Sequence, residues 1–449
     1  MDAPAISVTS TRGETSSICP DELLFFIQAA SKQEYLVCVL SEEEENKESP
    51  FKLSFHSAAS LPIDTPSSRV LASFPQHLTH KDDHSLDIVV STRAGTGKAL
   101  PFWGSILQPL LSRVSEELTG SSLAANVVIT KDEHSVANVA KNLSSRDSRH
   151  NTVVVISGDG GIIDLLNNYT PKADAPLPLL AVLPFGTGNA IFHSSHRPLY
   201  SKSKASQTVH ALRTLFLGST VDLPYFRASF SDGSVKTSFT AQAQAEDGAA
   251  TSQDSQVSRM YGTIVASYGF HASILYESDT PEYRAHGDKR FGMVAGNLLK
   301  ESHPYLATLE VRAPGGDFKP VARASHAYIL VAMVSNLEKT FTIAPDSEPL
   351  DGTLKLIHFG AIGGERTMEV MMKAYDNGKH VGMKWEDGEE VGYEEIEEVR
   401  ITTTEETPRW RKVCIDGSIV ELPKGGSMTV KKEQVPRLKI FVDASVASA

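Results

Sequence analysis

The 449-residue sequence has little cysteine, no long apolar run and no excess of positive charge, and each shortage excludes a class of protein. Its three cysteines, Cys19, Cys38 and Cys414, are far apart, which argues against a zinc site and predicts no disulfide partner. Apolar runs such as residues 328–334 are too short to cross a bilayer, and the first residues lack the apolar core of a secretory signal. The formal net charge of −12 disfavours nucleic acid as a partner. We therefore expect a protein of a reducing compartment such as the cytoplasm.

Apolar patterns divide the chain into three regions. Residues 1–84 contain short strand-like runs and are predicted to be an N-terminal extension, either a small β module or an appendage of the main body. In residues 85–220, buried-strand patterns alternate with helical ones, which predicts an α/β domain with a doubly wound, mostly parallel sheet. Residues 221–445 alternate and predict a β-rich, sandwich-like second domain. Within it, residues 231–257 have almost no bulky apolar side chains and are predicted to form a mobile loop.

Glycine-containing turns follow three of the predicted parallel strands. They span residues 91–99, 157–161 and 184–190, and their glycines are Gly95, Gly97, Gly158, Gly160, Gly161, Gly186 and Gly188. Glycine lets the backbone approach a phosphate closely, and the N–H groups at a helix start favour an anion. Because ligands bind at the carboxyl ends of parallel strands, the turns predict a phosphate cradle at that edge. The Walker A spacing and the GxGxxG dinucleotide pattern are both absent.

Asp159 lies between two glycines, directly after a predicted buried strand. A carboxylate on such a turn projects toward the ligand edge of the sheet, where it can accept a hydroxyl proton or bind Mg²⁺. Aspartate is also common in tight turns for conformational reasons alone, which is the alternative interpretation. Its place within the glycine cluster favours the chemical role.

Two of these turns resemble conserved blocks of the diacylglycerol kinase catalytic-domain superfamily. They read SGDG at 157–160 and PFGTGNA at 184–190. Three later blocks are similar, in the same order, to those of the sphingosine and ceramide kinases, the members that the chain most resembles: residues 267–291, 344–359 and 414–422. The resemblance spans residues 86–441.

The resemblance implies a fold and an activity. The expected protein is a lipid kinase that transfers the γ-phosphate of Mg-ATP to a hydroxyl of a sphingolipid or diacylglycerol. Its active site is expected in the cleft between an α/β nucleotide domain and a β-rich lipid-binding domain. ATP and Mg²⁺ are the implied cofactors. The implied partner is a membrane lipid at the bilayer surface, visited by a cytoplasmic, peripherally associated enzyme.

The resemblance also implies roles for individual residues. Asp159 is the expected general base or Mg²⁺-associated carboxylate. Arg284 and Arg290 fall where the sphingosine kinases place arginines near the ATP phosphates. The implied nucleotide-binding residues are Gly95, Gly97, Ser157, Gly158, Gly160, Gly161, Gly186, Thr187, Gly188, Asn189, Arg284, Arg290 and Asp416. The implied substrate-binding residues are Phe270, Ser273 and Leu275.

Some positions depart from the family pattern. Ser91 replaces an asparagine of the first turn, Gly161 a threonine after the second, and Ser418 the glutamate of the terminal DGE block. Loss of that glutamate is expected either to lower activity or to move its role to another acid such as Asp351, a weak candidate for a metal ligand. The departures leave open a catalytically impaired nucleotide- or lipid-binding regulator of the same fold. A soluble kinase such as NAD kinase or a phosphofructokinase is a second alternative, against which the block at 267–291 argues.

The segment after Gly269 bears on the acceptor. Sphingosine kinases carry two acids there, and at least one meets the cationic lipid head, whereas this chain has Ser273 and Leu275. A buried cation without a carboxylate partner is costly, so a neutral acceptor, ceramide or diacylglycerol, is expected over a free sphingoid base. Glu277 and Asp279 are the alternative sources of the missing charge.

Overall fold

The computed structural model groups the chain into two compact units. The first contains Met1–Gly186, Ser195–Asp222 and Arg437–Ala449, and the second contains Thr187–Ser194 and Leu223–Pro436. The structure describes residues 5–28, 34–43, 50–63, 65–81, 83–95, 97–146, 149–237, 256–287 and 289–447. Within these ranges, no helix combines the length and the apolar character needed to cross a bilayer.

A six-stranded sheet with the order β11-β25-β10-β9-β7-β8 forms the centre of the first unit. Its strands are β7 (His84–Val90), β8 (Asn126–Ile129), β9 (His150–Ser157), β10 (Leu179–Pro184), β11 (Ser219–Asp222) and β25 (Lys439–Val442). Neighbouring strands are parallel, except that β11 runs antiparallel to β25. The chain runs from β7 outward to β8 and then back past β7 to β9. This reversal creates a topological switch point, where ligands of open α/β sheets bind.

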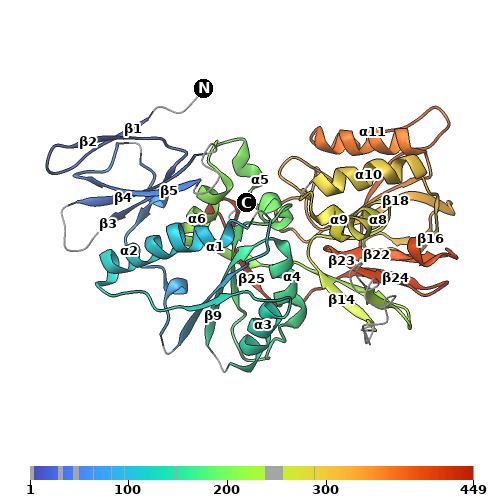
Figure 1. Cartoon of the computed structure of the whole chain (residues 1–449), viewed down its shortest axis with the longest axis horizontal. Helices are drawn as coiled ribbons and strands as arrows, with labels where there is room; N and C mark the ends of the chain where they lie inside the picture. The colour runs from blue at the N-terminus through green and yellow to red at the C-terminus, as the bar shows by residue number, and fades with distance from the viewer. Residues whose placement is uncertain are drawn as a thin grey trace. The chain divides into compact units, whose positions relative to one another are not determined.

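Helices follow the strands of this sheet (Figure 1). They are α1 (Ala99–Phe102), the π-helical turn η3 (Trp103–Leu107), α2 (Gln108–Thr119), α3 (Ser135–Ser145), α4 (Asp159–Asn168), α6 (Gln207–Leu217) and α12 (Ala444–Ala447). Helix α5 (Ala190–Tyr200) contains residues of both units. Local signals fix several ends: α2 stops at Gly120, which has φ +69°, and the Ser206 side chain caps α6 by accepting a hydrogen bond from the Val209 amide.

The N-terminal region forms its own small sheets within the first unit. One sheet pairs β1 (Ile6–Thr9) with β2 (Thr15–Ile18). The other has four strands, β3 (Leu23–Gln28), β4 (Tyr35–Glu42), β5 (Phe51–Ala58) and β6 (Val70–Leu71). Two 3-10 turns, η1 (Ser67–Arg69) and η2 (Gln76–Leu78), lie before and after β6 in the chain. Strand β3 is buried along almost its whole length and contacts α2 and α6. The Phe25 and Phe216 rings lie 4.8 Å apart across this contact. Residues 1–84 therefore contribute small sheets that pack onto the α/β part of the first unit.

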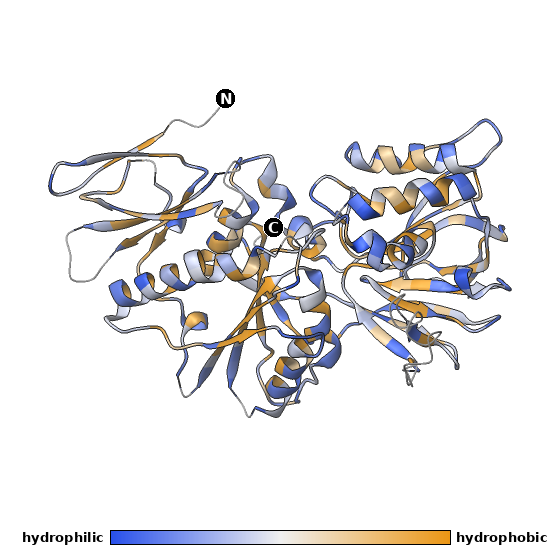
Figure 2. Cartoon of the chain, in the orientation of Figure 1, coloured by the Kyte–Doolittle hydropathy of each residue, from blue (hydrophilic) through white to orange (hydrophobic). Residues whose placement is uncertain are grey.

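Burial explains the apolar runs within the central strands, at 88–90 in β7 and 153–156 in β9. All seven residues of β7 are buried, and in β9 only His150 is exposed. Figure 2 shows the central strands of the first unit as hydrophobic. Strands of a parallel sheet are covered on both faces, which favours apolar side chains on both. Strand β7 nevertheless also buries the polar residues His84, Ser85 and Asp87.

Antiparallel strands make up most of the second unit, in the order β13-β23-β22-β15-β18-β16-β21-β24-β12-β14, with β17 beside β16 and β19 and β20 branching from β18. The strands are β12 (Phe226–Phe230), β13 (Val235–Thr237), β14 (Arg259–Gly262), β15 (Val265–Gly269), β16 (Tyr305–Arg312), β17 (Phe318–Pro320), β18 (Ser325–Ala332), β19 (Leu354–Gly360), β20 (Gly392–Ile396), β21 (Glu398–Thr403), β22 (Lys412–Ile415), β23 (Ser418–Glu421) and β24 (Ser427–Lys432). Its helices are α8 (Phe270–Glu277), α9 (Pro281–Arg284), α10 (Lys289–Glu301), α11 (Gly364–Tyr375) and the 3-10 turn η4 (Pro408–Trp410). Helix α8 contacts β15, β18, β22 and β23, and α10 lies beside α11 (Figure 1).

The predicted fold class, a mostly parallel α/β domain plus a β-rich domain, is confirmed. Two details of the predicted β domain differ. Strand β25 falls within residues 221–445, the range predicted for that domain, but it pairs with β10 in the parallel sheet of the first unit. Of the loop predicted at 231–257, residues 235–237 form β13, which pairs with β23, and residues 238–255 lie outside the described ranges.

Candidate functional site

Neighbouring strands bring the starts of the three glycine turns together. Ser157, at the end of β9, is paired with Pro184, at the end of β10. Beyond the strands, the Phe185 amide donates to the Ser157 carbonyl (3.0 Å) and the Ser91 amide donates to the Ile156 carbonyl (3.0 Å). The turns therefore leave the sheet at the same edge, as predicted from the strand pattern.

Glycines allow these turns to touch through their backbones. A Cβ at Gly95, which has φ +49°, would lie 2.4 Å from the Phe185 carbonyl oxygen. A Cβ at Gly158 would lie 2.8 Å from the Gly186 Cα. Real Cβ atoms do not approach so closely, so both positions require glycine for packing between turns. The third turn is thus held between the first and the second.

Packing between aromatic rings holds Phe185, and with it the third turn, in place. The Phe185 ring lies 4.6 Å from the ring of Phe102, in α1, and 6.0 Å from that of Phe51, at the start of β5. Phe51 and Phe102 also contact each other, with ring centroids 5.0 Å apart. The N-terminal sheet therefore supports the turn, a role that the sequence did not indicate.

The second turn places Asp159 at the first position of α4. Gly158 precedes it in an extended conformation as the N-cap residue, and the Asp159 side chain is half-buried. The free N–H groups of a first helical turn attract an anion. Among the described residues, no atom would lie within 4 Å of a Cβ at Gly160 or at Gly97, so the backbone at both positions faces open space. Thr96, between the glycines of the first turn, lies outside the described residues.

Gly161 has a local packing reason. A Cβ at this position would lie 2.4 Å from the Ser157 Oγ and 3.0 Å from the Val155 Cγ1. The Ser157 hydroxyl is fixed there because it donates to the Gly158 carbonyl at 2.7 Å. Gly161, where the family has threonine, thus accommodates Ser157 and need not signal a degraded turn.

The third turn continues into residues grouped with the second unit, namely Thr187, Gly188 and Asn189. Asn189 is buried and has φ +52°, a left-handed conformation that asparagine adopts more readily than most residues. Its carbonyl accepts a hydrogen bond from the His193 amide at 2.9 Å, in the first turn of α5. Asn189 therefore shapes the entry into α5.

In the second unit, Asp279 interacts electrostatically with both arginines predicted to meet phosphate and hydrogen-bonds one of them, Arg284. Asp279 accepts a hydrogen bond from the Arg284 Nε at 2.9 Å, while the Arg284 side chain is 54% exposed. Burial lowers the pKa of Arg290, an effect that Asp279 opposes and Arg284 reinforces. The buried Arg290 Nε has no hydrogen-bond partner among the described residues. Two guanidinium groups beside one carboxylate leave an excess of positive charge, which suits an anion.

Asp416 holds the backbone of its own unit. It lies in the turn between β22 and β23 with φ +46°. Its carboxylate accepts hydrogen bonds from the amides of Thr263 (2.7 Å), Ile264 (3.1 Å) and Val265 (2.6 Å). These bonds give Asp416 a structural role that sequence analysis missed, and nucleotide binding by this residue stays a prediction.

The predicted substrate-binding residues lie on α8. Phe270 and Ser273 are buried, and the Tyr305 hydroxyl donates to the Ser273 Oγ at 2.8 Å. Leu275 is half-buried and packs against a cluster that includes Cys414. Their contact with a lipid stays a prediction.

Asp351 is an exposed turn residue. Its carboxylate accepts hydrogen bonds from the Thr353 amide (2.8 Å) and hydroxyl (3.0 Å). Across the described ranges, no group of three or more His, Cys, Asp or Glu side chains is placed to hold a metal ion. Among the described residues Asp351 is therefore not part of such a group, and its metal role stays a prediction.

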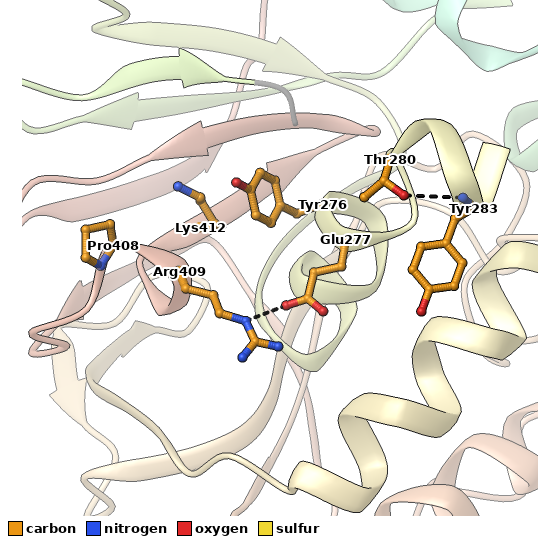
Figure 3. A pocket seen from close by; sticks show the side chains of 7 residues that line it. All are labelled: Tyr276, Glu277, Thr280, Tyr283, Pro408, Arg409 and Lys412. Atoms are coloured by element: carbon orange, nitrogen blue, oxygen red, sulfur yellow. Dashed lines mark hydrogen bonds and ion pairs between the residues drawn. The ribbon is translucent and has the colours of Figure 1, made fainter. Parts of the chain in front are cut away.

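A pocket of about 340 Å³ opens in the second unit beside α8 (Figure 3). Its lining residues are Tyr276, Glu277, Thr280, Tyr283, Pro408, Arg409 and Lys412. Of these residues, the sequence indicated only Glu277, as a possible source of negative charge near the lipid head. Arg409 and Lys412 lie more than a hundred residues from α8, and no local pattern connects them with it.

Comparisons with known proteins agree with this geometry. The family model of the diacylglycerol kinase catalytic domain matches residues 86–220. Two solved structures from Bacillus anthracis strain Sterne, both provisionally assigned as diacylglycerol kinases, share the fold. One is 13% identical, covers 82% of this chain and 100% of its own, and has a TM-score of 0.51. The other is 14% identical, covers 81% of this chain and 98% of its own, and has a TM-score of 0.52. No curated protein matches the sequence significantly.

Proposed function

Residues 86–220 belong to the diacylglycerol kinase catalytic-domain family, and on this basis we propose that the protein is an ATP-dependent lipid kinase. In this proposal it transfers the γ-phosphate of Mg-ATP to a hydroxyl of a sphingolipid or diacylglycerol. The observation that carries the proposal is the packing of Gly95 and Gly158 against the turn at Phe185–Gly186, with Asp159 at the head of α4.

The turns supply the nucleotide site in this proposal. Open space at Gly97 and Gly160 lets phosphate oxygens approach the backbone without meeting a side chain. The first N–H groups of α4 add the favourable end of a helix dipole. Mg²⁺, when bound with ATP, neutralises phosphate charge, and Asp159 is the carboxylate that would contact it.

Asp159 is the proposed general base. The acceptor hydroxyl oxygen forms a bond to the γ-phosphorus, the bond from that phosphorus to the ADP oxygen breaks, and the hydroxyl proton passes to the Asp159 carboxylate. Such transfer depends mostly on positioning and on stabilising charge on the moving phosphoryl group. Arg284 and Arg290 are the proposed source of that positive charge.

A neutral acceptor is the proposed substrate class. Both acids that might have met a cationic head are already paired, Asp279 with Arg284 and Glu277 with Arg409. Ser273 can still donate its hydroxyl proton to an acceptor oxygen. Ceramide and diacylglycerol fit these groups better than a free sphingoid base. We propose that the enzyme binds these lipids at the bilayer surface, with which it associates peripherally.

Labelled ATP and mixed micelles of ceramide, diacylglycerol or sphingosine test the proposal directly. We expect phosphorylated product from a neutral lipid, and its loss in Asp159→Asn. Absence of product from all three lipids, together with retained ATP or lipid binding, would favour the alternative of a binding regulator. Ser418 motivates that alternative, whereas Gly161 no longer does, because Ser157 explains it.

A further inference from the structure

The charged side chains that line the pocket beside α8 are paired, and Arg409 makes the pair that involves Glu277. The Arg409 Nε donates to the Glu277 Oε1 at 2.7 Å, as Figure 3 shows. Its two terminal nitrogens donate to the two oxygens of Glu301, each at 3.0 Å. The guanidinium also lies over the Trp410 ring, 4.0 Å from its centroid. Arg409 is therefore held on three sides, and Glu277 is bound by a fixed cation.

Lys412 provides the second cation of the wall. It is only 3% exposed, its ammonium group pairs with Glu421, and it lies 4.9 Å from the centre of the Tyr276 ring. Burial lowers the pKa of Lys412, which Glu421 partly offsets. An ammonium group has three N–H donors, and among the described residues this one donates a hydrogen bond to Glu421 alone. Lys412 therefore retains donor capacity for an oxygen acceptor, while its charge is already balanced.

These groups select a class of ligand by charge. A cationic head would find Glu277 occupied by Arg409, and an anionic head would compete with Glu421 for Lys412. An uncharged head with a carbonyl or hydroxyl oxygen can accept from Lys412 without disturbing either pair. The rings of Tyr276 and Tyr283 offer apolar surface beside it.

We propose that this pocket receives the uncharged polar head of the acceptor lipid, and that Arg409 sets the preference by holding Glu277. The proposal rests on the lipid kinase activity proposed above and adds a specificity determinant to it. Arg409 acts through Glu277, so it is a positioning residue. Removing Arg409 releases a carboxylate into the pocket, which then favours a cationic amine.

The central experiment compares acceptors in a matched set of variants. In Arg409→Gln, we expect the rate ratio of sphingosine to ceramide to rise by about fivefold, the upper value for one partly exposed ion pair. The double variant Arg409→Gln/Glu277→Gln should lose this gain, because the released carboxylate is gone. Arg366→Gln is the control: Arg366 also pairs with a carboxylate, Asp387, and lies over a tryptophan ring, Trp385, yet it does not line the pocket. Its ratio should stay at the wild-type value.

A binding measurement separates this proposal from the lipid kinase proposal. Without ATP, a short-chain ceramide should change the fluorescence of Trp410. The Trp410→Phe variant identifies this signal, because the change should be absent from it. A short-chain sphingoid base should bind more tightly to Arg409→Gln than to wild type. If no lipid is phosphorylated but these binding shifts occur, the kinase proposal fails and the pocket assignment stands. If lipids are phosphorylated and neither the rate ratio nor the binding changes in Arg409→Gln, the pocket assignment is wrong.

Discussion

A methyl group on Gly158 would lie 2.8 Å from the Cα of Gly186, so the second and third turns of the first unit pack backbone against backbone. The third turn cannot shift without losing packing, because the Phe185 ring lies against the rings of Phe51 and Phe102. If the turns bind nucleotide as proposed, substitutions at neighbouring glycines should separate the effect on stability from the effect on nucleotide binding.

Gly158→Ala should destabilise the protein, whereas Gly160→Ala should not. At position 158 a backbone atom must shift, which costs about 1–3 kcal/mol. At position 160 the added methyl meets no atom within 4 Å, and alanine favours the helix. Thermal unfolding followed by circular dichroism measures the difference. If Gly160 faces phosphate as proposed, Gly160→Ala should weaken ATP binding while its melting temperature is unchanged or raised; equal melting temperatures for both variants would contradict the packing argument.

Asp159→Asn should lower kcat by roughly 10²-fold or more, because the amide cannot take the hydroxyl proton. Nucleotide binding should be largely kept, since the amide conserves the shape of the side chain. Asp174→Asn, at an exposed position of the same unit, is the matched control and should behave as wild type. Near-normal turnover of Asp159→Asn on the best lipid would remove the residue from the chemistry.

Arg284→Ala and Arg290→Ala should each reduce turnover more than lipid docking, since the charge they meet develops on phosphate. The loss should be larger for Arg290, which is the more buried and has an unpartnered Nε within the described structure. Steady-state kinetics and sedimentation with lipid vesicles measure the two effects, with Arg366→Ala as control. A loss confined to vesicle binding would assign both arginines to the membrane surface.

Asp416→Asn should lower stability by roughly 1–3 kcal/mol, the cost of leaving a buried N–H without its acceptor. Asparagine tolerates the left-handed backbone at this position, so the substitution tests the hydrogen bonds to Thr263, Ile264 and Val265. Denaturant unfolding should show the loss, and Asp317→Asn, at an exposed turn, should not. An unchanged midpoint for Asp416→Asn would show that the three bonds contribute little.

The protein should lose stability as the pH falls below about 6.5, the ordinary pKa of histidine. Burial lowers the pKa of His380 to about 4, so between these values the unfolded chain binds a proton that the folded chain does not. Stability therefore rises with pH across this window, and at pH 5 a buried histidine of this kind costs roughly 2 kcal/mol. His380→Gln retains a donor for the Ile343 carbonyl but does not titrate, so it should flatten the pH dependence of the unfolding midpoint. An unaltered slope between pH 7 and pH 5 would assign the effect to other groups.

Short-range patterns determined much of the fold. Strands β7 and β9 were predictable because they contain the apolar runs 88–90 and 153–156, which are typical of a strand buried on both faces, and the turns at 157–161 and 184–190 were predictable because glycine is needed where backbones meet closely. The resemblance to lipid kinases rests on these same local blocks. The order of residues alone therefore sufficed to place Asp159 at the carboxyl end of β9.

Only the tertiary structure decided which distant residues pair. Nothing near Glu277 in the sequence indicates that Arg409, 132 residues away, occupies it, and nothing near Asp416 indicates that it holds residues 263–265. The membership of β25 in the parallel sheet was equally hidden, because a short strand with three apolar residues fits either kind of sheet. Periodicity records the faces that an element buries, whereas the partner that covers each face is set by the packing of the whole chain.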